Sequence, residues 1–441
     1  MSLKNSVDCL EVLEDRIRKR ECVVGIFGLG YVGLPLAMCF TYAGVKVVGF
    51  DIDPKKISIL SGGKSYISTV SDLQVAEALN LGFSATSDYK AASELDSILI
   101  CVPTPLNQYR QPDLSFVEKT LDALRPYIRK GQVLGLESTT WPGTTEEVVV
   151  PAVESTGLSV GSDIAVVYSP EREDPGNQEY STANIPKIIG GATSRCLRVG
   201  KALYEIGVQE MVEVSSLKVA EMSKLLENIH RAVNIGLVNE MKIVSDKMGI
   251  NINEVIDAAS TKPFGFVPYR PGPGLGGHCL PIDPFYLAWK AREYGVNTRF
   301  IELAGEINHY MPMWVIEKVS SVLNNYGKAI KGSSILVLGI AYKKNINDTR
   351  ESPAIELIDQ LSKMGALISY SDPYVPKFPK KRRYSYSLTS VDLCSRTLRS
   401  FDCIVIATDH DVFDYDLIEK SSNFVIDTRN RINRGPRCIH A

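Results

Sequence analysis

A cysteine in a glycine-rich stretch is the side chain of this sequence best suited to covalent chemistry. Cys279 lies in PGPGLGGHCLPIDP, residues 271–284, where glycines let the backbone approach a ligand closely and leave the sulfur little shielded. Asp283 follows four residues later and can manage a proton. A free cysteine is more often a small buried side chain, a role that fits Cys22 and Cys101 in their apolar strands. The stretch alone leaves both interpretations open.

Several polar side chains share one face of a predicted helix, residues 218–249. Lys224 and Asn228 are four residues apart, with Glu221 a turn earlier and Arg231 a turn later. Such a face is usually solvated. In a desolvated cleft, however, the pKa of a lysine falls far enough for the side chain to act as an acid or base. Lys224 is therefore a candidate proton-transfer group.

Three glycines indicate a site for a dinucleotide. Gly28, Gly30 and Gly33 form G-x-G-x-x-G between a predicted strand and a helix, where they permit a tight turn, close approach of a pyrophosphate and close packing. Asp51 ends the next strand 18 residues after Gly33, the place of an acid that binds ribose hydroxyls. A carboxylate there repels a 2′-phosphate, which favours NAD over NADP. Asp53 is the competing acid, and one of the two could merely cap the following helix.

Hydroxyls and charges follow two further predicted strands. Thr140 lies in ESTTWPGTT after one strand, and Glu171 and Arg172 lie in SPEREDPGN after another. The carboxyl ends of the strands form the ligand crevice in doubly wound sheets. The competing interpretations are hydroxyls that satisfy backbone groups of a turn and the charges of a solvated loop.

A charged segment at residues 341–357, AYKKNINDTRESPAIEL, opens a late helix. Lys343, Lys344 and Arg350 there suit a second anionic group, such as the diphosphate of a nucleotide, although a surface loop of mixed charge is the alternative. The basic tract at residues 377–387 is interpreted as a solvated loop, because it carries too few charges to indicate nucleic-acid binding.

The elements that must position these groups form an α/β protein. Strand and helix patterns alternate at both ends of the chain, and long helical periodicity fills the middle. The sequence therefore predicts two Rossmann-like domains joined by a long-helix central domain. We place the first at residues 1–213, the central domain with the cysteine loop at 214–329, and the last at 330–441.

The composition is that of an ordinary globular protein. The 441 residues are 44% hydrophobic and 23% charged, and a formal charge of −2 gives no general attraction to nucleic acid or membrane. No apolar run approaches the roughly 18 residues that span a bilayer, and the N-terminus lacks a signal-peptide pattern, so we expect a cytoplasmic protein. Nine scattered cysteines without a CxxC pair argue against disulfides and against a metal site.

Seven segments in order carry a resemblance to a known family. They are GLGYVGLPLA, CVPTPL, ESTTWPGTTEE, SPEREDPGN, KLLENIHRAVNIGLVNE, PGPGLGGHCLPIDP and AYKKNINDTRESPA. Over nearly its whole length the chain resembles the UDP-glucose/UDP-mannose dehydrogenase family. The resemblance implies an NAD-binding first domain, a central domain that forms the core of a homodimer, and a UDP-binding last domain.

The resemblance also implies roles for individual residues. It makes Cys279 the thiol nucleophile, assisted by Asp283, Lys224, Asn228, Glu171 and Thr140. The implied NAD site comprises Gly28, Gly30, Tyr31, Val32, Gly33, Asp51, Lys56, Thr104 and Thr140. The implied substrate site comprises Glu171, Arg172, Lys224, Asn228, Arg231, Arg270, Gly276, Lys343 and Arg350.

The chain departs from the glucose-oxidising members of that family at three places. It has PEREDPG where they have P-E-F-L-x-E-G, Glu227 where they have alanine, and His278 before the cysteine. These differences resemble the branch that acts on UDP-N-acetylhexosamines, especially UDP-N-acetylglucosamine 6-dehydrogenases of surface-polysaccharide pathways. Arg172 and Arg270 are candidates for contacts specific to that branch.

The expected reaction is a four-electron oxidation of the sixth-carbon hydroxyl to a uronic acid through a cysteine thiohemiacetal and thioester, with two NAD. UDP-N-acetylmannosamine, UDP-N-acetylgalactosamine and UDP-glucose remain alternative substrates. A β-hydroxyacid-type dehydrogenase would stop after one hydride and need no thiol. A protein that senses NAD without turnover is the alternative outside enzymes.

Overall fold

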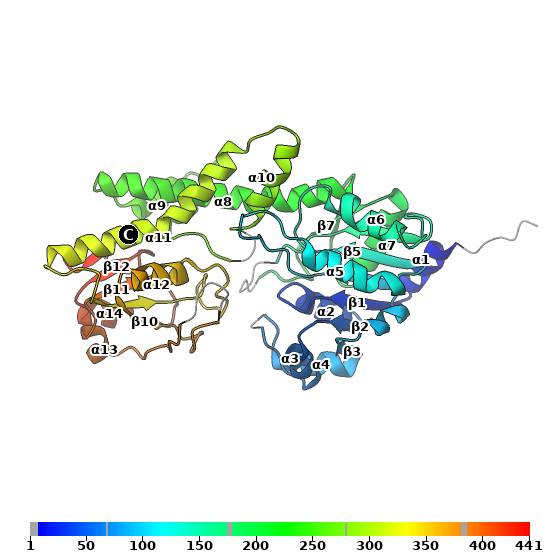
Figure 1. The fold of residues 1–441 in the computed structure, drawn as a ribbon, viewed down its shortest axis with the longest axis horizontal. Helices are drawn as coiled ribbons and strands as arrows, with labels where there is room; N and C mark the ends of the chain where they lie inside the picture. Colours follow the sequence, from blue (N-terminus) through cyan, green and yellow to red (C-terminus); the bar gives the residue numbers. More distant parts are fainter. Residues whose placement is uncertain (1–7, 68, 174–178, 278–279, 381–385) are drawn as a thin grey trace, which may run out of the picture. The chain divides into compact units, whose positions relative to one another are not determined.

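The computed structural model describes residues 8–67, 69–173, 179–277, 280–380 and 386–441. The chain divides into two compact units (Figure 1). Unit 1 comprises Met1–Glu227 and Phe285–Gly295, and unit 2 comprises Asn228–Pro284 and Val296–Ala441. The division falls inside two helices, α8 (Leu217–Lys247) and α10 (Asp283–Glu293).

An eight-stranded sheet forms the centre of unit 1, in the order β3-β2-β1-β4-β5-β6-β7-β8. Its pairings are parallel except for that of β6 with β7. The order 3-2-1-4-5-6 is that of a dinucleotide-binding Rossmann fold. The strands are β1 (Val23–Phe27), β2 (Lys46–Phe50), β3 (Phe83–Thr86), β4 (Ser97–Ile100), β5 (Gln132–Leu136), β6 (Ile164–Tyr168), β7 (Lys187–Gly191) and β8 (Met211–Glu213).

Helices cover the sheet of unit 1, shown in blue to green in Figure 1. Strands β4, β5 and β6 are buried at every position, because helices cover both faces of a parallel sheet. Helix α2 packs on β1 and β2, and α7 packs on β6 and β7. The helices are α1 (Cys9–Arg18), α2 (Gly33–Tyr42), α3 (Pro54–Ser61), α4 (Asp72–Leu81), α5 (Ser115–Leu124), α6 (Val150–Glu154) and α7 (Ser194–Tyr204).

A parallel sheet of five strands, in the order β10-β9-β11-β12-β13, forms the core of unit 2. This 2-1-3-4-5 order is the other common doubly wound arrangement. The strands are β9 (Ser334–Leu338), β10 (Leu367–Ser371), β11 (Cys403–Ile406), β12 (Val425–Asp427) and β13 (Cys438–His440). The remaining helices are α9 (Ile252–Ser260), α11 (Arg299–Asn325), α12 (Pro353–Lys363), α13 (Ser395–Arg399) and α14 (Tyr415–Ser421).

The predicted fold class is confirmed. Both ends of the chain form Rossmann-like α/β sheets, and the described residues between β8 and β9 form helices and loops without strands. The longest of these helices, α8, has 31 residues. None of the described helices combines the length and the apolar character that crossing a membrane requires.

Candidate active site

The glycine turn between β1 and α2 has the geometry of a dinucleotide site. Gly28 has a φ of +95°, and a Cβ there would meet the Cys101 carbonyl oxygen at 2.8 Å. A Cβ at Gly33 would lie 1.9 Å from the carbonyl oxygen of Gly28. A Cβ at Gly30 would instead meet nothing within 4 Å, so the protein leaves room there for the close approach of a pyrophosphate. The residues present therefore fit NAD.

The two acids after β2 have different partners. Asp51 accepts from the backbone N–H of Leu29 at 3.1 Å and from Lys56 Nζ at 2.8 Å. Asp53 caps α3 by accepting from the N–H of Lys55 at 2.9 Å. Capping accounts for Asp53, so Asp51, which contacts the glycine turn directly, is the better placed acid for a ribose.

Hydroxyl groups line the carboxyl end of β4 and β5. Ser138 donates to the carbonyl of Val102 at 2.7 Å, and Thr104 donates to that of Thr139 at 2.7 Å. These two hydroxyls thus satisfy backbone groups. The fully buried Thr140 hydroxyl, in contrast, has no hydrogen-bond partner among the described residues. A buried polar atom without a partner is costly, which favours a ligand contact for Thr140.

Helix α8 holds the loop that follows Thr140. The carboxylate of Glu221 accepts from the backbone N–H of Gly143 at 2.5 Å and from that of Thr145 at 2.8 Å. Burial raises the pKa of Glu221 to about 7, although these hydrogen bonds oppose the rise. The sequence placed Glu221 on the polar face of the helix but did not indicate this anchoring role.

Glu171 follows β6 with one carboxylate oxygen fixed. Its Oε1 accepts from the backbone N–H groups of Arg172 and Glu173 at 2.7 and 2.8 Å. Its Oε2 is buried without a hydrogen bond among the described residues and lies 3.6 Å from Lys187 Nζ. Sequence reasoning did not single out Lys187.

The guanidinium of Arg172 is engaged by the protein. It pairs with Glu227 on α8 at 2.6 Å and donates to the carbonyl of Pro186 at 2.7 Å. Glu227 and Arg172, two residues that the resemblance associated with the N-acetylhexosamine branch, are thus partners of each other.

The polar face of α8 is buried. Lys224 and Asn228 are 7% and 8% exposed, which excludes the solvated interpretation. Asn228 Nδ2 donates to the carboxylate of Asp283, at the start of α10, at 2.5 Å. Arg231 is exposed on the same helix. Cys279 and His278 lie outside the described residues.

The glycine-rich loop packs on the segment between β9 and α12. A Cβ at Gly276 would meet the Tyr342 side chain at 2.7 Å, and the N–H of Gly277 donates to the carbonyl of Arg350 at 3.0 Å. Three predicted substrate residues, Gly276, Lys343 and Arg350, therefore belong to neighbouring segments of unit 2. The guanidinium of Arg350 forms a hydrogen-bonded ion pair with Asp348.

Arg270 has partners on α9. Its guanidinium forms an ion pair with Asp257 and donates to the carbonyl of Asn253 at 3.3 Å. These contacts fix the start of the glycine-rich loop, so a role in holding that loop competes with the expected substrate contact.

The acid after β10, Asp372, shares backbone contacts with Asp51 but has more of them. Asp372 accepts from the N–H groups of Ile340 and Ala341 and contacts His410 Nε2 at 3.1 Å. Its other oxygen accepts from two further backbone N–H groups. Both carboxylates are buried, with Asp372 1% exposed and Asp51 8% exposed.

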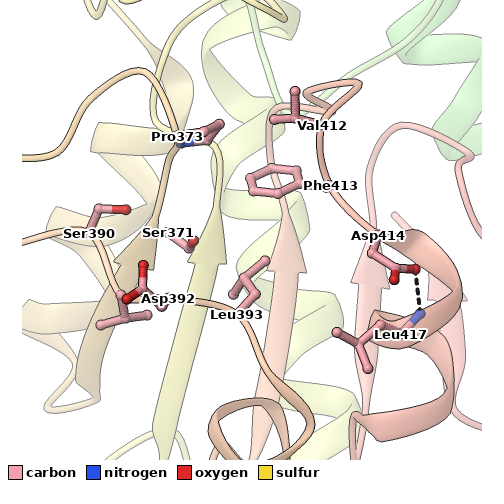
Figure 2. A pocket seen from close by; sticks show the side chains of 10 residues that line it. Ser371, Pro373, Ser390, Asp392, Leu393, Val412, Phe413, Asp414 and Leu417 are labelled. Atoms are coloured by element: carbon pink, nitrogen blue, oxygen red, sulfur yellow. Dashed lines mark hydrogen bonds between the residues drawn. The ribbon is translucent and has the colours of Figure 1, made fainter.

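A cavity of about 260 Å³ lies beside β10 and α14 in unit 2 (Figure 2). It contains none of the predicted substrate residues. Its lining includes the carboxylates of Asp392 and Asp414, which repel a diphosphate, and Asp414 caps α14 by accepting from the N–H of Leu417. We therefore do not place the nucleotide there.

Three side chains of metal-ligand type converge at β12 and β13. Potential ligand atoms of Asp427, Cys438 and His440 lie within 4.8 Å of one another. The Asp427 carboxylate accepts three backbone N–H bonds, and His440 Nε2 contacts the carbonyl of Ile432 at 2.8 Å. Burial raises the pKa of Cys438 to about 12. These contacts give the group a structural role in the sheet.

Known proteins match the whole architecture. Three family models cover the chain: the NAD binding, central and UDP binding domains of the UDP-glucose/GDP-mannose dehydrogenase family match residues 22–208, 218–310 and 336–434. The UDP-N-acetyl-D-glucosamine 6-dehydrogenase of Salmonella typhi is 34% identical over 89% of the chain and 91% of its own length.

Two relatives are named for the mannosamine substrate. The UDP-N-acetyl-D-mannosamine dehydrogenase of Methanocaldococcus jannaschii is 33% identical over 96% of the chain and 95% of its own length. A solved UDP-D-ManNAc dehydrogenase of Pyrococcus horikoshii is 33% identical, covers 94% of the chain and 97% of its own, and superimposes with a TM-score of 0.86. Similarity of this level over this length determines the family and the fold.

Proposed function

Because the chain belongs to the UDP-glucose/GDP-mannose dehydrogenase family and is thus an NAD-dependent UDP-sugar dehydrogenase, we propose that it oxidises the sixth-carbon hydroxyl of UDP-N-acetylglucosamine to the uronic acid. The matching models name this family for UDP-glucose and GDP-mannose, where the resemblance named it for UDP-glucose and UDP-mannose. The relatives named for UDP-N-acetylglucosamine and the ion pair of Arg172 with Glu227 support the N-acetylhexosamine branch.

The buried hydrogen bond from Asn228 to Asp283 is the observation that carries the proposed chemistry. It joins α8, which also bears the buried Lys224, to the residue four places after Cys279 in the chain. An amide, an amine and a carboxylate withdrawn from bulk water are the groups that alcohol oxidation and thioester hydrolysis need. The amine and the carboxylate can transfer protons, and the amide and the protonated amine can stabilise an oxyanion.

Gly28, Gly30, Gly33 and Asp51 would hold NAD, with Thr140 near its reactive end. When bound, NAD accepts the hydride in each of the two oxidations. Lys224, with Asp283 and a water, takes the proton of the alcohol. The buried positions of both side chains keep that proton from exchanging freely with solvent.

Cys279 then divides the second oxidation into two easier steps. Its sulfur adds to the aldehyde carbon and its proton passes to the carbonyl oxygen, which gives a thiohemiacetal. Loss of a hydride and the hydroxyl proton leaves a thioester. A water activated by Glu171 or Asp283 breaks the carbon–sulfur bond, releasing the carboxylate and restoring the thiol. Asn228 and Lys224 stabilise the oxyanions.

We further propose a homodimer through unit 2 and a cytoplasmic location. Leu237, Met241 and Val244 follow one another by four and three residues, so they share one face of α8, and all three are exposed, as is Met248 just beyond the helix. Val244 and Leu303 of α11 line a shallow cavity of about 390 Å³ on this surface. Exposed apolar patches of this kind mark interfaces between proteins.

The deciding experiment measures NADH production from UDP-glucose, UDP-galactose and the UDP forms of N-acetylglucosamine, N-acetylgalactosamine and N-acetylmannosamine. We expect two NADH per sugar with UDP-N-acetylglucosamine preferred. Cys279→Ala abolishes full oxidation, whereas Cys394→Ser, which removes an exposed thiol elsewhere, does not. Preference for another sugar refutes the substrate assignment. Full oxidation by Cys279→Ala refutes the covalent route, and NAD binding without any turnover indicates a sensor.

A further inference from the structure

Four polar side chains of unit 1 form a largely buried network. The hydroxyl of Tyr204, on α7, donates to the Glu137 carboxylate after β5. Glu137 pairs with Lys187 at the start of β7 at 2.7 Å, and Lys187 Nζ lies 3.6 Å from Glu171. Tyr204, Glu137 and Lys187 are at most 3% exposed. The network therefore ends at Glu171, the carboxylate that we propose as a base.

Lys187 is shared unequally by two carboxylates. Its Nζ lies closer to Glu137 than to Glu171 and also donates to the carbonyl of Pro170 at 3.2 Å. Burial disfavours the protonated amine, but Glu137 and then Glu171 outweigh this and raise the pKa of Lys187. Burial likewise raises the pKa of Glu137, against the influence of Lys187. The protonated Lys187 therefore interacts with two carboxylates, those of Glu137 and Glu171.

The other charged side chains described beside Glu171 have partners of their own. Arg172 is occupied by Glu227, and Glu173 accepts from the hydroxyl of Thr182 at 3.1 Å. Burial raises the pKa of Cys39 to about 11 and that of Cys101 well above its usual range, so both thiols are neutral at physiological pH. In the described part of the chain, Lys187, which Glu137 shares, is thus the buried cation that faces the Glu171 carboxylate.

We propose that the Glu137–Lys187 pair is a positioning unit that sets the basicity of Glu171. This rests on the proposed role of Glu171 as a base. Glu137 holds the ammonium group at 2.7 Å and thereby keeps it from closing on Glu171, whose Oε2 then stays free to accept a proton. A buried charge within about 4–6 Å shifts a carboxyl pKa by about 1–3 pH units, which is enough to decide whether a base works at neutral pH.

Two substitutions should move the titration of Glu171 in opposite directions. Lys187→Met removes the cation, so the midpoint rises by about one pH unit or more. Glu137→Gln removes a neighbouring negative charge and releases Lys187 toward Glu171, so the midpoint falls. Lys187→Arg keeps the cation and should restore the wild-type midpoint. A purely structural ion pair would change stability without this pattern.

The titration is measured without substrate, by ¹³C NMR of the full chain labelled at the glutamate side-chain carboxyl carbon, with Glu171→Gln to identify the signal. Unchanged or same-direction midpoints overturn the proposal. If Lys187→Met fails to fold, the double variant Glu137→Gln/Lys187→Met leaves no uncompensated partner, and its midpoint should still exceed that of the wild type.

The kinetic readout separates this inference from the proposed function. The acid limb of the pH profile for kcat should follow the same directions, with KM for the UDP-sugar nearly constant. If the two variants shift the NMR titration midpoint in opposite directions but no UDP-sugar is turned over, the positioning unit is supported and the proposed function is refuted. Turnover with a pH profile that neither Lys187→Met nor Glu137→Gln changes refutes the positioning unit alone.

Discussion

Oε1 of Glu221 accepts two hydrogen bonds from Thr145, one from the backbone N–H at 2.8 Å and one from the hydroxyl at 2.7 Å. The same carboxylate also accepts from the N–H of Gly143. These contacts join the start of α8 to the loop after β5, which carries Thr140. The position of the Thr140 hydroxyl therefore depends on a side chain 81 residues away in the sequence.

Glu221→Ala leaves the two backbone N–H groups buried without an acceptor. We expect the free energy of unfolding to fall by about 3 kcal/mol, since each unsatisfied donor costs roughly 1–3 kcal/mol. Urea unfolding measures the loss, and amide exchange at Gly143 and Thr145 should accelerate. Glu221→Gln keeps an acceptor oxygen and serves as the control. Equal stability of the alanine variant and the wild type would show that the loop is held by other contacts.

Two glycine substitutions should separate cofactor binding from folding. Gly30→Ala adds a methyl group where the protein leaves open space, so thermal stability stays near wild type while the Kd for NADH rises about tenfold or more. Gly33→Ala forces a methyl group against the Gly28 carbonyl and lowers the melting temperature. Fluorescence titration with NADH and thermal unfolding test the pair. Unchanged NADH affinity in Gly30→Ala would contradict the dinucleotide site.

Asp51→Asn removes the charge that excludes a 2′-phosphate. The ratio of kcat/KM with NAD to that with NADP should fall about tenfold, and loss of the Lys56 ion pair should lower stability slightly. Asp53→Asn is the matched control, because asparagine caps helices as well as aspartate does, and its cofactor preference should not change. A change confined to Asp53→Asn would reverse the assignment of the two acids.

The burial of Lys242 should make the stability of the protein depend on pH. Burial, chiefly, lowers the pKa of this lysine to about 7 from an ordinary value of 10.5. Between these values the unfolded chain binds a proton that the folded chain does not, so the free energy of unfolding should rise as pH rises from about 7 to 10.5. Lys242→Met removes this rise, whereas Lys247→Met, at an exposed position of the same helix, preserves it. Parallel pH curves for both variants would argue against the shift.

We expect the exposed apolar surface that contains Val244 of α8 and Leu303 of α11 to form the dimer interface. Val244→Glu together with Leu303→Glu should convert a dimer to a monomer in size-exclusion chromatography with light scattering, because two carboxylates would enter an apolar contact. Leu367→Glu changes an exposed leucine of the same unit outside this face and should leave the dimer intact. A dimer that persists in the double variant places the interface elsewhere.

The sequence predicted the features that depend on local geometry. The glycine turn and Asp51 lie within one strand-helix-strand unit, and Lys224 and Asn228 lie one turn apart, so spacing alone relates them. The Glu137–Lys187 pair spans 50 residues and requires that β5, β6 and β7 be neighbours. No periodicity records which strands are adjacent, and the sequence therefore did not reveal this pair.

The two acids that follow second strands, Asp51 and Asp372, differ in whether they can change partners. One partner of Asp51 is the ammonium group of the partly exposed Lys56, which an arriving ribose can displace. Asp372 is enclosed by four backbone N–H groups and His410, and any new partner would have to break the turn that the carboxylate maintains. Adding glycines alone would therefore not create a second dinucleotide site in unit 2. Asp372 would have to be replaced first, and that substitution would remove the hydrogen bonds that hold the turn.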